Sequence, residues 1–376
     1  MRRLHSELLV HVPLACLLLA LLAPGAALAE APSAVSYQES DVLPSVNVMQ
    51  EGSDAASLRV GGTIQLWAIP MLGEDALLDN GDAGNAPGFR LRRARLGMKG
   101  TFPKYVTMEL TLNPLDPHHM VHDANITYQP MAEIGLVLGA AKVPYSRFQL
   151  DSSSKLRFYD RPMGTGEVSM DHRLGAALQG SIADGMLSYV AGVYNAADGS
   201  FGSGNTARGV LYGGRLESAP MGALASLTPE DFRIRFGGGA VYEDGSTQDT
   251  LAYSGDLLLE GYRVQLRGEY LKDVRTPDAD PILPPTLNAE VERQSIVAEL
   301  TAFILTDRLE AALRYETYDS NLEVEDFGDA NIYVGGLNGY IYGHSLKVIL
   351  NYIYREETGG AKLDNDALIL SFGGAI

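Results

Sequence analysis

Residues 262–270 read YRVQLRGEY, and apolar and polar side chains alternate along this stretch. Residues 106–113, 309–316 and 346–354 repeat the alternation, which begins at Leu58 and continues toward the C-terminus. Successive side chains of a β-strand point to opposite faces, so each segment has one apolar and one polar face. Alternating segments of roughly ten residues separated by turn residues are the sequence signal of a transmembrane β-barrel.

A soluble β-sandwich is the alternative, because its strands also alternate, with the apolar face inward. The length of the segments favours the membrane barrel, since strands of soluble proteins usually have five or six residues. The connections also alternate in length. Short ones lie near residues 102–105, 130–133, 183–185, 261, 305–307 and 342–344, long ones near 71–87, 114–120, 145–171, 196–207, 273–289, 319–329 and 356–365, with 218–231 as an exception.

This pattern predicts an all-β fold over residues 57–376. We expect a closed antiparallel transmembrane β-barrel of about 16 strands, with short periplasmic turns and long outer loops. Closure is required because lipid has no partners for free backbone groups, so a sheet in the membrane cannot leave an open edge.

The N-terminal residues have the pattern of a secretory signal peptide. Arg2 and Arg3 precede an apolar run that ends in Ala27-Leu28-Ala29, a small-x-small cleavage pattern. An uncleaved anchor helix is the alternative, but prolines interrupt the run. We therefore expect a cleaved signal peptide over residues 1–29 and a periplasmic N-terminal linker over residues 30–56, which show no clear period. This predicts export to the Gram-negative outer membrane.

Cysteine content and charge narrow the function. The only cysteine, Cys16, lies inside the apolar run, so the exported chain would have neither disulfides nor a reactive thiol. The net charge of −18 argues against nucleic acid as a partner. After the signal, the sequence has no apolar run near the length of a membrane helix.

Residues 89–100, FRLRRARLGMKG, are the most informative segment for function. Arg93, Arg95 and Lys99 have the parity of the lumen-facing side chains. Rings of arginine or lysine in a pore favour anions, so this row predicts an anion path. The alternatives are that these cations pair with acids across the lumen or line its rim, and the rim is the expected place of Arg90 and Arg92.

The same segment begins a resemblance to the phosphate-selective porin O and P family. The resemblance rests on "FRLRRARLGMKG", on "LVLGAAKVPYS" before a long third loop, on "LGAALQG" followed by "LSYVAGVYNAADG", and on "VGGLNGYIYGHSLKVILNYIY" near the C-terminus. It covers nearly all of the chain from about Leu58. The resemblance implies a homotrimer of sixteen-stranded barrels, with an inward third loop and an anion path of arginines and lysines.

Carried over to this sequence, the resemblance matches the arginine-rich strand at Arg92, Arg93 and Arg95. The third loop would be residues 145–171, with Lys155, Arg157 and Arg161 as constriction cations. Further cations with lumen parity complete the expected anion path: Arg235, Arg267, Arg314 and Lys347. The sequence also departs from the pattern, because acids share the lumen parity and the usual terminal aromatic is displaced to Phe372.

One histidine-rich segment has ligand types that suit a metal. His118, His119 and His122 with Asp116 fall within residues 116–123, but no second cluster completes a site. We therefore predict no metal and no cofactor. Outside the signal there are five histidines, none of them in a recognisable hydrolase motif, so we also predict no enzymatic activity.

The sequence as a whole predicts an outer-membrane porin, a passive diffusion channel for small hydrophilic solutes with a preference for anions such as phosphate. The expected partners are outer-membrane lipid and lipopolysaccharide, the permeating solutes or anions, and two further copies of the chain in a homotrimer. Two other functions stay open at this point. They are a structural or adhesive barrel with a plugged lumen, and an outer-membrane enzyme.

Overall fold

A computed structural model provides the structure of the chain, which divides into two compact units, Met1–Pro32 and Ser33–Ile376. All of the described residues belong to the second unit. They are residues 45–50, 56–73, 87–102, 105–116, 120–196, 201, 205, 209–219, 232–278, 289–325, 328–360 and 362–375. No helix among them is long and apolar enough to cross a membrane.

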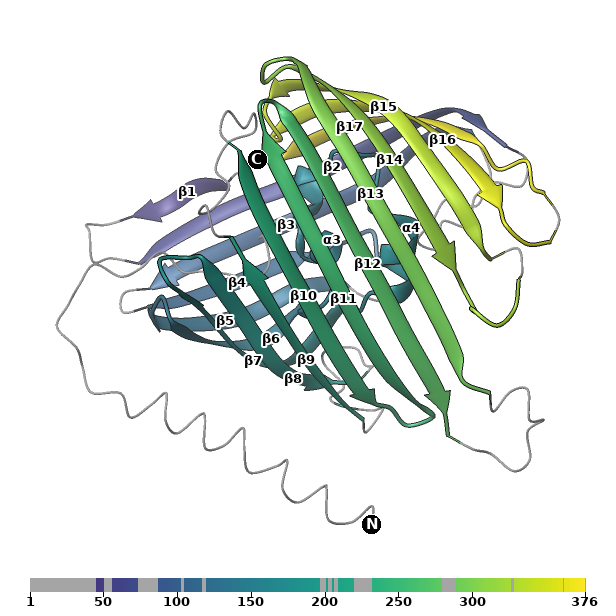
Figure 1. The fold of residues 1–376 in the computed structure, drawn as a ribbon. Coiled ribbons are helices and arrows are strands. Elements are labelled where there is room, and N and C mark those ends of the chain that lie inside the picture. Colours follow the sequence, from purple (N-terminus) through teal and green to yellow (C-terminus); the bar gives the residue numbers. More distant parts are fainter. Residues whose placement is uncertain are drawn as a thin grey trace. The chain divides into compact units, whose positions relative to one another are not determined.

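Sixteen antiparallel strands close into a barrel (Figure 1). Each strand from β2 to β17 pairs with the next along the chain, and β17 pairs with β2. The strands are β2 Ser57–Leu72, β3 Gly88–Phe102, β4 Val106–Leu112, β5 Val121–Met131, β6 Ile134–Lys142, β7 His172–Ile182, β8 Leu187–Asn195, β9 Val210–Ser218, β10 Arg233–Asp244, β11 Gln248–Gly261, β12 Val264–Pro277, β13 Val291–Leu305, β14 Leu309–Asp319, β15 Ala330–Tyr342, β16 Leu346–Glu357 and β17 Ala367–Ala375. The predicted fold class is confirmed.

An additional strand precedes the barrel. β1, Ser45–Gln50, pairs antiparallel with the first residues of β2, from Ser57 to Gly61. The rest of β2, from Thr63, pairs with β17. The structure thus contains a strand inside residues 30–56, where the absence of a period in the sequence suggested only a linker.

The two faces of the wall are those that the alternation predicts. Leu266, Leu313 and Leu350 are 42%, 58% and 39% exposed on the outer surface of the sheet. On the opposite parity, Arg314 and Lys347 are buried inside the barrel. An arginine or lysine that faced lipid at the bilayer midplane would cost about 2–4 kcal/mol, which explains this parity.

The start of the diagnostic segment 262–270 differs from the prediction. Tyr262 and Arg263 both have positive φ, 51° and 68°, and form a two-residue turn between β11 and β12. Consecutive positive φ values are typical of the type I′ hairpin, whose twist matches that of the flanking strands. The strand therefore begins at Val264, and Arg263 lies in a turn rather than on the lumen wall.

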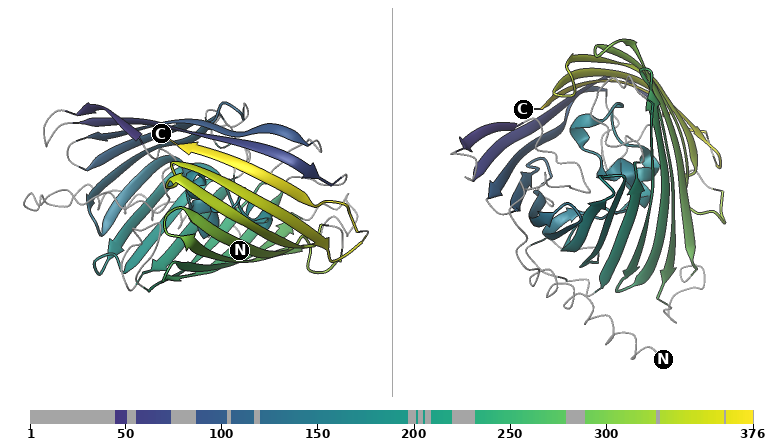
Figure 2. Two further views of the ribbon diagram at one scale, coloured as in Figure 1. Left: turned by 90° about the horizontal axis from the view of Figure 1, so that it is seen from above. Right: turned by 60° about the vertical axis from the view of Figure 1, so that its left-hand side comes forward.

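The third long connection, residues 143–171, folds into the barrel, and we call it the inward loop. It contains the short helices α3 (Arg147–Leu150), η1 (Ser153–Lys155) and α4 (Met163–Val168). The right-hand view of Figure 2 shows these helices inside the ring of strands. Ser146 and Ser152 cap the first two helices through their side-chain oxygens.

Candidate functional site: the inward loop and the cavity beside it

Apolar side chains of the inward loop pack against two parts of the wall. Tyr145 and Val168 belong to a buried cluster with side chains of β6–β12 and β14. Phe158 and Tyr159 belong to a second cluster with side chains of β2 and β14–β17. In that cluster the rings of Trp67 and Tyr159 have centroids 5.6 Å apart. Full burial of a large apolar side chain stabilises by about 1.5–3 kcal/mol, so these clusters hold the loop in one position.

Wall side chains also satisfy the loop's backbone. The Met163 N–H donates to Glu316 Oε2 at 2.7 Å, and the Tyr159 N–H donates to Asn351 Oδ1 at 2.8 Å. A buried backbone group without a partner costs about as much as a lost hydrogen bond. These bonds therefore replace water as the loop's partner and fix its register along the wall.

Helix α4 approaches the wall so closely that it requires a glycine. A Cβ atom built on Gly164 would lie 2.1 Å from Ser295 Oγ of β13. Any larger residue at this position would push α4 away from the wall.

The predicted anion-path residue Arg93 is an anchor of the inward loop. It is 5% exposed and forms an ion pair with Asp160 of the loop, and it also donates to Gln65 of β2. Arg92 forms a second ion pair with Asp160, at 2.7 Å. Arg92 is the extra residue where the register between β2 and β3 shifts, a β-bulge that turns two consecutive arginines toward one carboxylate. Arg92, which was expected at the rim of the lumen, therefore contacts Asp160 of the inward loop.

The charge of Asp160 depends on these arginines. Burial alone would raise the pKa of its carboxyl group, but the charges of Arg93 and Arg92 and the hydrogen bond from Arg93 outweigh burial. The pKa of Asp160 is held well below its usual value. The loop is thus tied to β3 by a carboxylate that stays ionised.

Three other predicted cations also contact the inward loop. Arg314 Nη2 donates to the Asp160 carbonyl at 2.9 Å and pairs with Glu299. Lys347 Nζ donates to the Ser154 carbonyl at 2.8 Å. Arg267 forms an ion pair with Asp151 of the loop. Their inward orientation agrees with the prediction, and their contacts are with the loop.

The remaining predicted wall cations differ from one another. Lys99 lies 3.5 Å from Glu109 of β4, its cross-strand neighbour, and 30% of its side chain is exposed. Arg235 lies 3.8 Å from Glu217. Arg95 donates to Ser153 Oγ of the loop at 3.1 Å and lines the cavity described below.

The predicted constriction cations have three different surroundings. Arg157 points to the wall, where it pairs with the buried Glu310. Arg161 donates to two backbone carbonyls of the loop, those of Phe148 at 3.0 Å and Asp151 at 2.7 Å. Lys155 ends η1 and is exposed. Arg157 thus stabilises the loop's contact with the wall, and Arg161 stabilises the fold of the loop itself.

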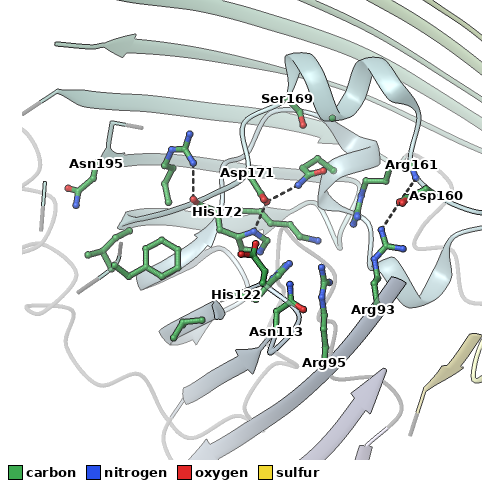
Figure 3. A pocket seen from close by; sticks show the side chains of 18 of the residues that line it. Arg93, Arg95, Asn113, His122, Asp160, Arg161, Ser169, Asp171, His172 and Asn195 are labelled. Carbon is green, nitrogen blue, oxygen red and sulfur yellow. Dashed lines mark hydrogen bonds and ion pairs between the residues drawn. The ribbon is translucent and has the colours of Figure 1, made fainter. Parts of the chain in front are cut away.

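A cavity of about 490 Å³ lies between the inward loop and the strands β3 and β5–β8 (Figure 3). Its lining includes residues of the long connections 113–120 and 196–209, so it lies toward the long-loop end of the barrel. Six cationic and three acidic side chains of the described residues line it. They are Arg92, Arg93, Arg95, Lys142, Arg161 and Arg173, with Asp116, Asp160 and Asp171.

The sequence reasoning missed Asp160 and Lys142, whereas Arg173 has the parity of the lumen-facing side chains in the sequence. Lys142 is 2% exposed and donates to the carbonyls of Leu150 and Asp151, and it lies inward at the end of β6, next to the expected loop. Its place after an apolar run was the signal that could have found it. Asp160 had no such signal, because the partner of an acid within a long loop follows only from the loop's fold.

A closed sixteen-stranded barrel with an inward third loop defines the class of outer-membrane porins. The chain belongs to the phosphate-selective porin O and P family, whose sequence model matches residues 73–270. The resemblance read from the sequence is thereby confirmed. The protein is an outer-membrane diffusion channel, and this supports the channel over the structural or adhesive barrel.

Solved structures with similar folds are porins and channels of the outer membrane. The chain is similar to a loop-deletion mutant of OmpT from Vibrio cholerae, with 11% identity over 86% of this chain and 100% of that one, and a TM-score of 0.59. It is also similar to the channel DcaP of Acinetobacter baumannii, with 10% identity over 87% and 99% of the chains and a TM-score of 0.58. OprB of Pseudomonas putida gives 10% identity, 86% and 94% coverage and a TM-score of 0.55. No curated protein sequence matches the chain.

Proposed function

We propose that this channel prefers anions and that the cavity beside the inward loop is where the preference arises. The observation that carries the proposal is the lining of the cavity, in which six cations face three acids among the described residues. Exposed charges are screened beyond about 8–10 Å in physiological salt, so the acidic net charge of the whole chain acts weakly inside the lumen. The cations of the lining act on a permeating ion at short range.

The proposal divides the predicted anion path into two groups. Arg95 and Arg173 belong to the selective lining. Lys142 lines the same cavity, but it is 2% exposed and holds two carbonyl groups of the loop. Arg93, Arg267, Arg314 and Lys347 act mainly as anchors, because each binds a carboxylate or a backbone carbonyl of the inward loop. The contact of Arg95 with the loop is a hydrogen bond to the Ser153 hydroxyl. Lys99 and Arg235 each lie beside an acid of the wall and contribute less. Arg157 and Arg161 narrow the lumen by holding the loop inside it, and the exposed Lys155 adds a cation to the loop.

Reversal potential in a salt gradient across a planar bilayer tests the preference. The native channel should be anion-selective, and Arg95→Gln should shift the reversal potential toward cations. Lys362→Gln removes the same charge from a side chain that is 81% exposed in an outer loop, so it should leave the reversal potential unchanged. A cation-selective native channel would contradict the proposal and leave a general porin.

The remaining features of the proposal concern export and assembly. We propose that residues 1–29 are a cleaved signal peptide, that residues 30–56 act as a periplasmic linker, and that the barrel is surrounded by lipid and lipopolysaccharide. A homotrimer is supported by a structure of OmpT from Vibrio cholerae in trimer form, 12% identical with a TM-score of 0.57. No catalytic role is part of the proposal. N-terminal sequencing of the exported protein and chemical cross-linking test cleavage and assembly.

A further inference from the structure

Two histidines and two aspartates meet at the wall of the cavity, at the long-loop ends of β5 and β7. His122 Nδ1 lies 3.3 Å from Asp123 Oδ2, and His172 Nε2 lies 3.1 Å from Asp123 Oδ1. The two imidazole rings are 3.9 Å apart between centroids. One ligand atom from each of His122, Asp123 and His172 falls within 4.8 Å of the other two. Figure 3 shows both histidines beside Asp171.

The fold supplies the partner that the histidine-rich segment lacks in the sequence. Asp123 follows His122 on β5, and His172 begins β7, after the whole inward loop. Strand β6 lies between them and pairs with both, with Ala140 opposite Ala124 and Lys142 opposite His172. His118 and His119, which suggested a site in the sequence, lie outside the described residues.

His172 is held in the orientation of a metal ligand. Its Nδ1 lies 2.6 Å from Asp171 Oδ1, which also accepts a hydrogen bond from Gln149 Nε2 at 2.9 Å. A histidine that binds a metal through one ring nitrogen almost always donates its other N–H to a carboxylate, carbonyl or water. The other nitrogen, Nε2, is buried and lies 3.1 Å from Asp123 Oδ1. His172 itself is 8% exposed.

The spacing and chemistry of the three ligand atoms fit a small divalent ion. Tetrahedral zinc has nitrogen and oxygen ligands at about 2.0–2.2 Å, which places neighbouring ligands about 3.3 Å apart. The two contacts, one to each carboxylate oxygen of Asp123, are about this long, and one ligand atom from each residue lies within 4.8 Å of the other two. The carboxylates of Asp123 and Asp171 offset the charge of a divalent ion. Imidazole and carboxylate ligands together suit zinc and its transition-metal neighbours better than magnesium or calcium.

We infer that His122, Asp123 and His172 form a binding site for a divalent transition-metal ion of the zinc class, with Asp171 orienting His172. His122 and His172 line the cavity, so the ion would lie at its wall, with the fourth position left for water or a solute. The inference does not depend on anion preference, since it concerns binding by the folded chain. An ion bound here would add positive charge to the cavity.

Metal binding by the purified full-length protein in detergent tests the site. After treatment with a chelator, the protein is titrated with Zn²⁺ by calorimetry and with Co²⁺ by visible absorption, which is intense when Co²⁺ is tetrahedral. One ion per chain should bind. His122→Gln and His172→Gln should abolish binding, and Asp171→Asn should weaken it by about 10–100-fold, as the loss of an outer-shell partner does.

Two controls separate this site from other histidines. His344→Gln removes a histidine of the β15–β16 turn and should bind zinc as the native protein does. The double variant His118→Gln/His119→Gln should also retain binding. Asp171→Asn keeps all three ligands, so a fall in its affinity reports the orientation of His172 even if a ligand variant folds poorly. Absence of zinc binding by the native protein, or retention of it by His172→Gln, overturns the inference.

Discussion

Arginines and lysines of the barrel wall have different surroundings on the two sides of the inward loop. On the side of β12–β16, Arg267, Arg314 and Lys347 end on loop atoms, and the loop's aromatic side chains pack among them. Arg314 lies over the ring of Phe158, at 4.1 Å. On the side of β3–β8, Arg95 and Arg173 line a cavity. Under the proposed function, a lumen-facing cation acts on permeating ions only where the loop leaves space beside it.

Deletion of part of the inward loop should have the largest effect, because it removes the side of the loop that fills the lumen. Removing residues 152–161 eliminates Phe158, Tyr159 and the carbonyl groups that Lys347 binds. The lumen beside β14–β17 would then be open to water, and single-channel conductance should rise several-fold. A deletion of equal length in the β12–β13 connection, residues 279–288, is the control and should change conductance little. Equal conductance of the native and 152–161 deletion proteins would show that the loop is no constriction.

Asp160→Asn should have the next largest effect, because it leaves Arg92 and Arg93 facing a neutral group. Removal of one partner from a buried ion pair costs about 3–5 kcal/mol, since the remaining charge stays buried without compensation. The free energy of unfolding should fall by about this amount. The current through single channels should also become noisier as the loop moves away from β3.

Glu356→Gln is the matched control for this substitution. It also replaces a carboxylate by an amide, but its partner Lys362 is 81% exposed. An exposed ion pair contributes about 0–1 kcal/mol, so the free energy of unfolding should change little. If the free energy of unfolding fell by similar amounts in Asp160→Asn and Glu356→Gln, the ion pairs of Asp160 would be no stronger than an exposed ion pair.

Single substitutions of Arg93 and Arg95 sharpen the comparison within one strand. Arg93 is buried against Asp160 and Gln65, so Arg93→Gln should act mainly on conductance and noise through the loop. Arg95 lines the cavity, so Arg95→Gln should act mainly on the reversal potential. The shift in reversal potential should be clearly larger for Arg95→Gln. Equal shifts would place both arginines on the ion path, as the sequence alone suggested.

The barrel could be predicted from the sequence because every strand has the same alternation of side chains, which can be read from neighbouring residues. The alternation of residues such as Leu313 and Arg314 reports which side faces lipid, and that requirement applies to every strand in the same way. The expected short turns and most of the long loops also follow from local composition. The alternation placed the hairpin residues Tyr262 and Arg263 inside a strand, because positive φ is uncommon for tyrosine and arginine and the sequence does not signal it.

The candidate site could be predicted only in part, because its contacts join residues far apart in the chain. The alternation rule places Arg93 inward but does not show the bulge that brings Arg92 beside it. Nor does it show that Asp160, in an irregular loop, meets both. His172 is separated from His122 by the whole of β6 and the inward loop. Such pairings depend on tertiary packing, for which a single sequence has no periodic signal.

The pH dependence of the Asp160 contact is the smallest effect that we predict. The pKa of Asp160 in the folded protein is held well below its usual value, because Arg93 and Arg92 outweigh the effect of burial. A group with a lowered pKa stabilises the folded state fully above its unfolded pKa, about 3.9 for aspartate, and loses this contribution as pH falls toward the folded pKa. The stability difference between the native protein and Asp160→Asn should therefore be constant down to about pH 5 and shrink below about pH 4. Because other titrating groups are common to both proteins, they cancel in the difference, which urea unfolding at each pH can measure. A difference that already declines between about pH 7 and pH 5 would show a carboxyl group protonated far above the predicted range, and therefore one that the arginines do not hold.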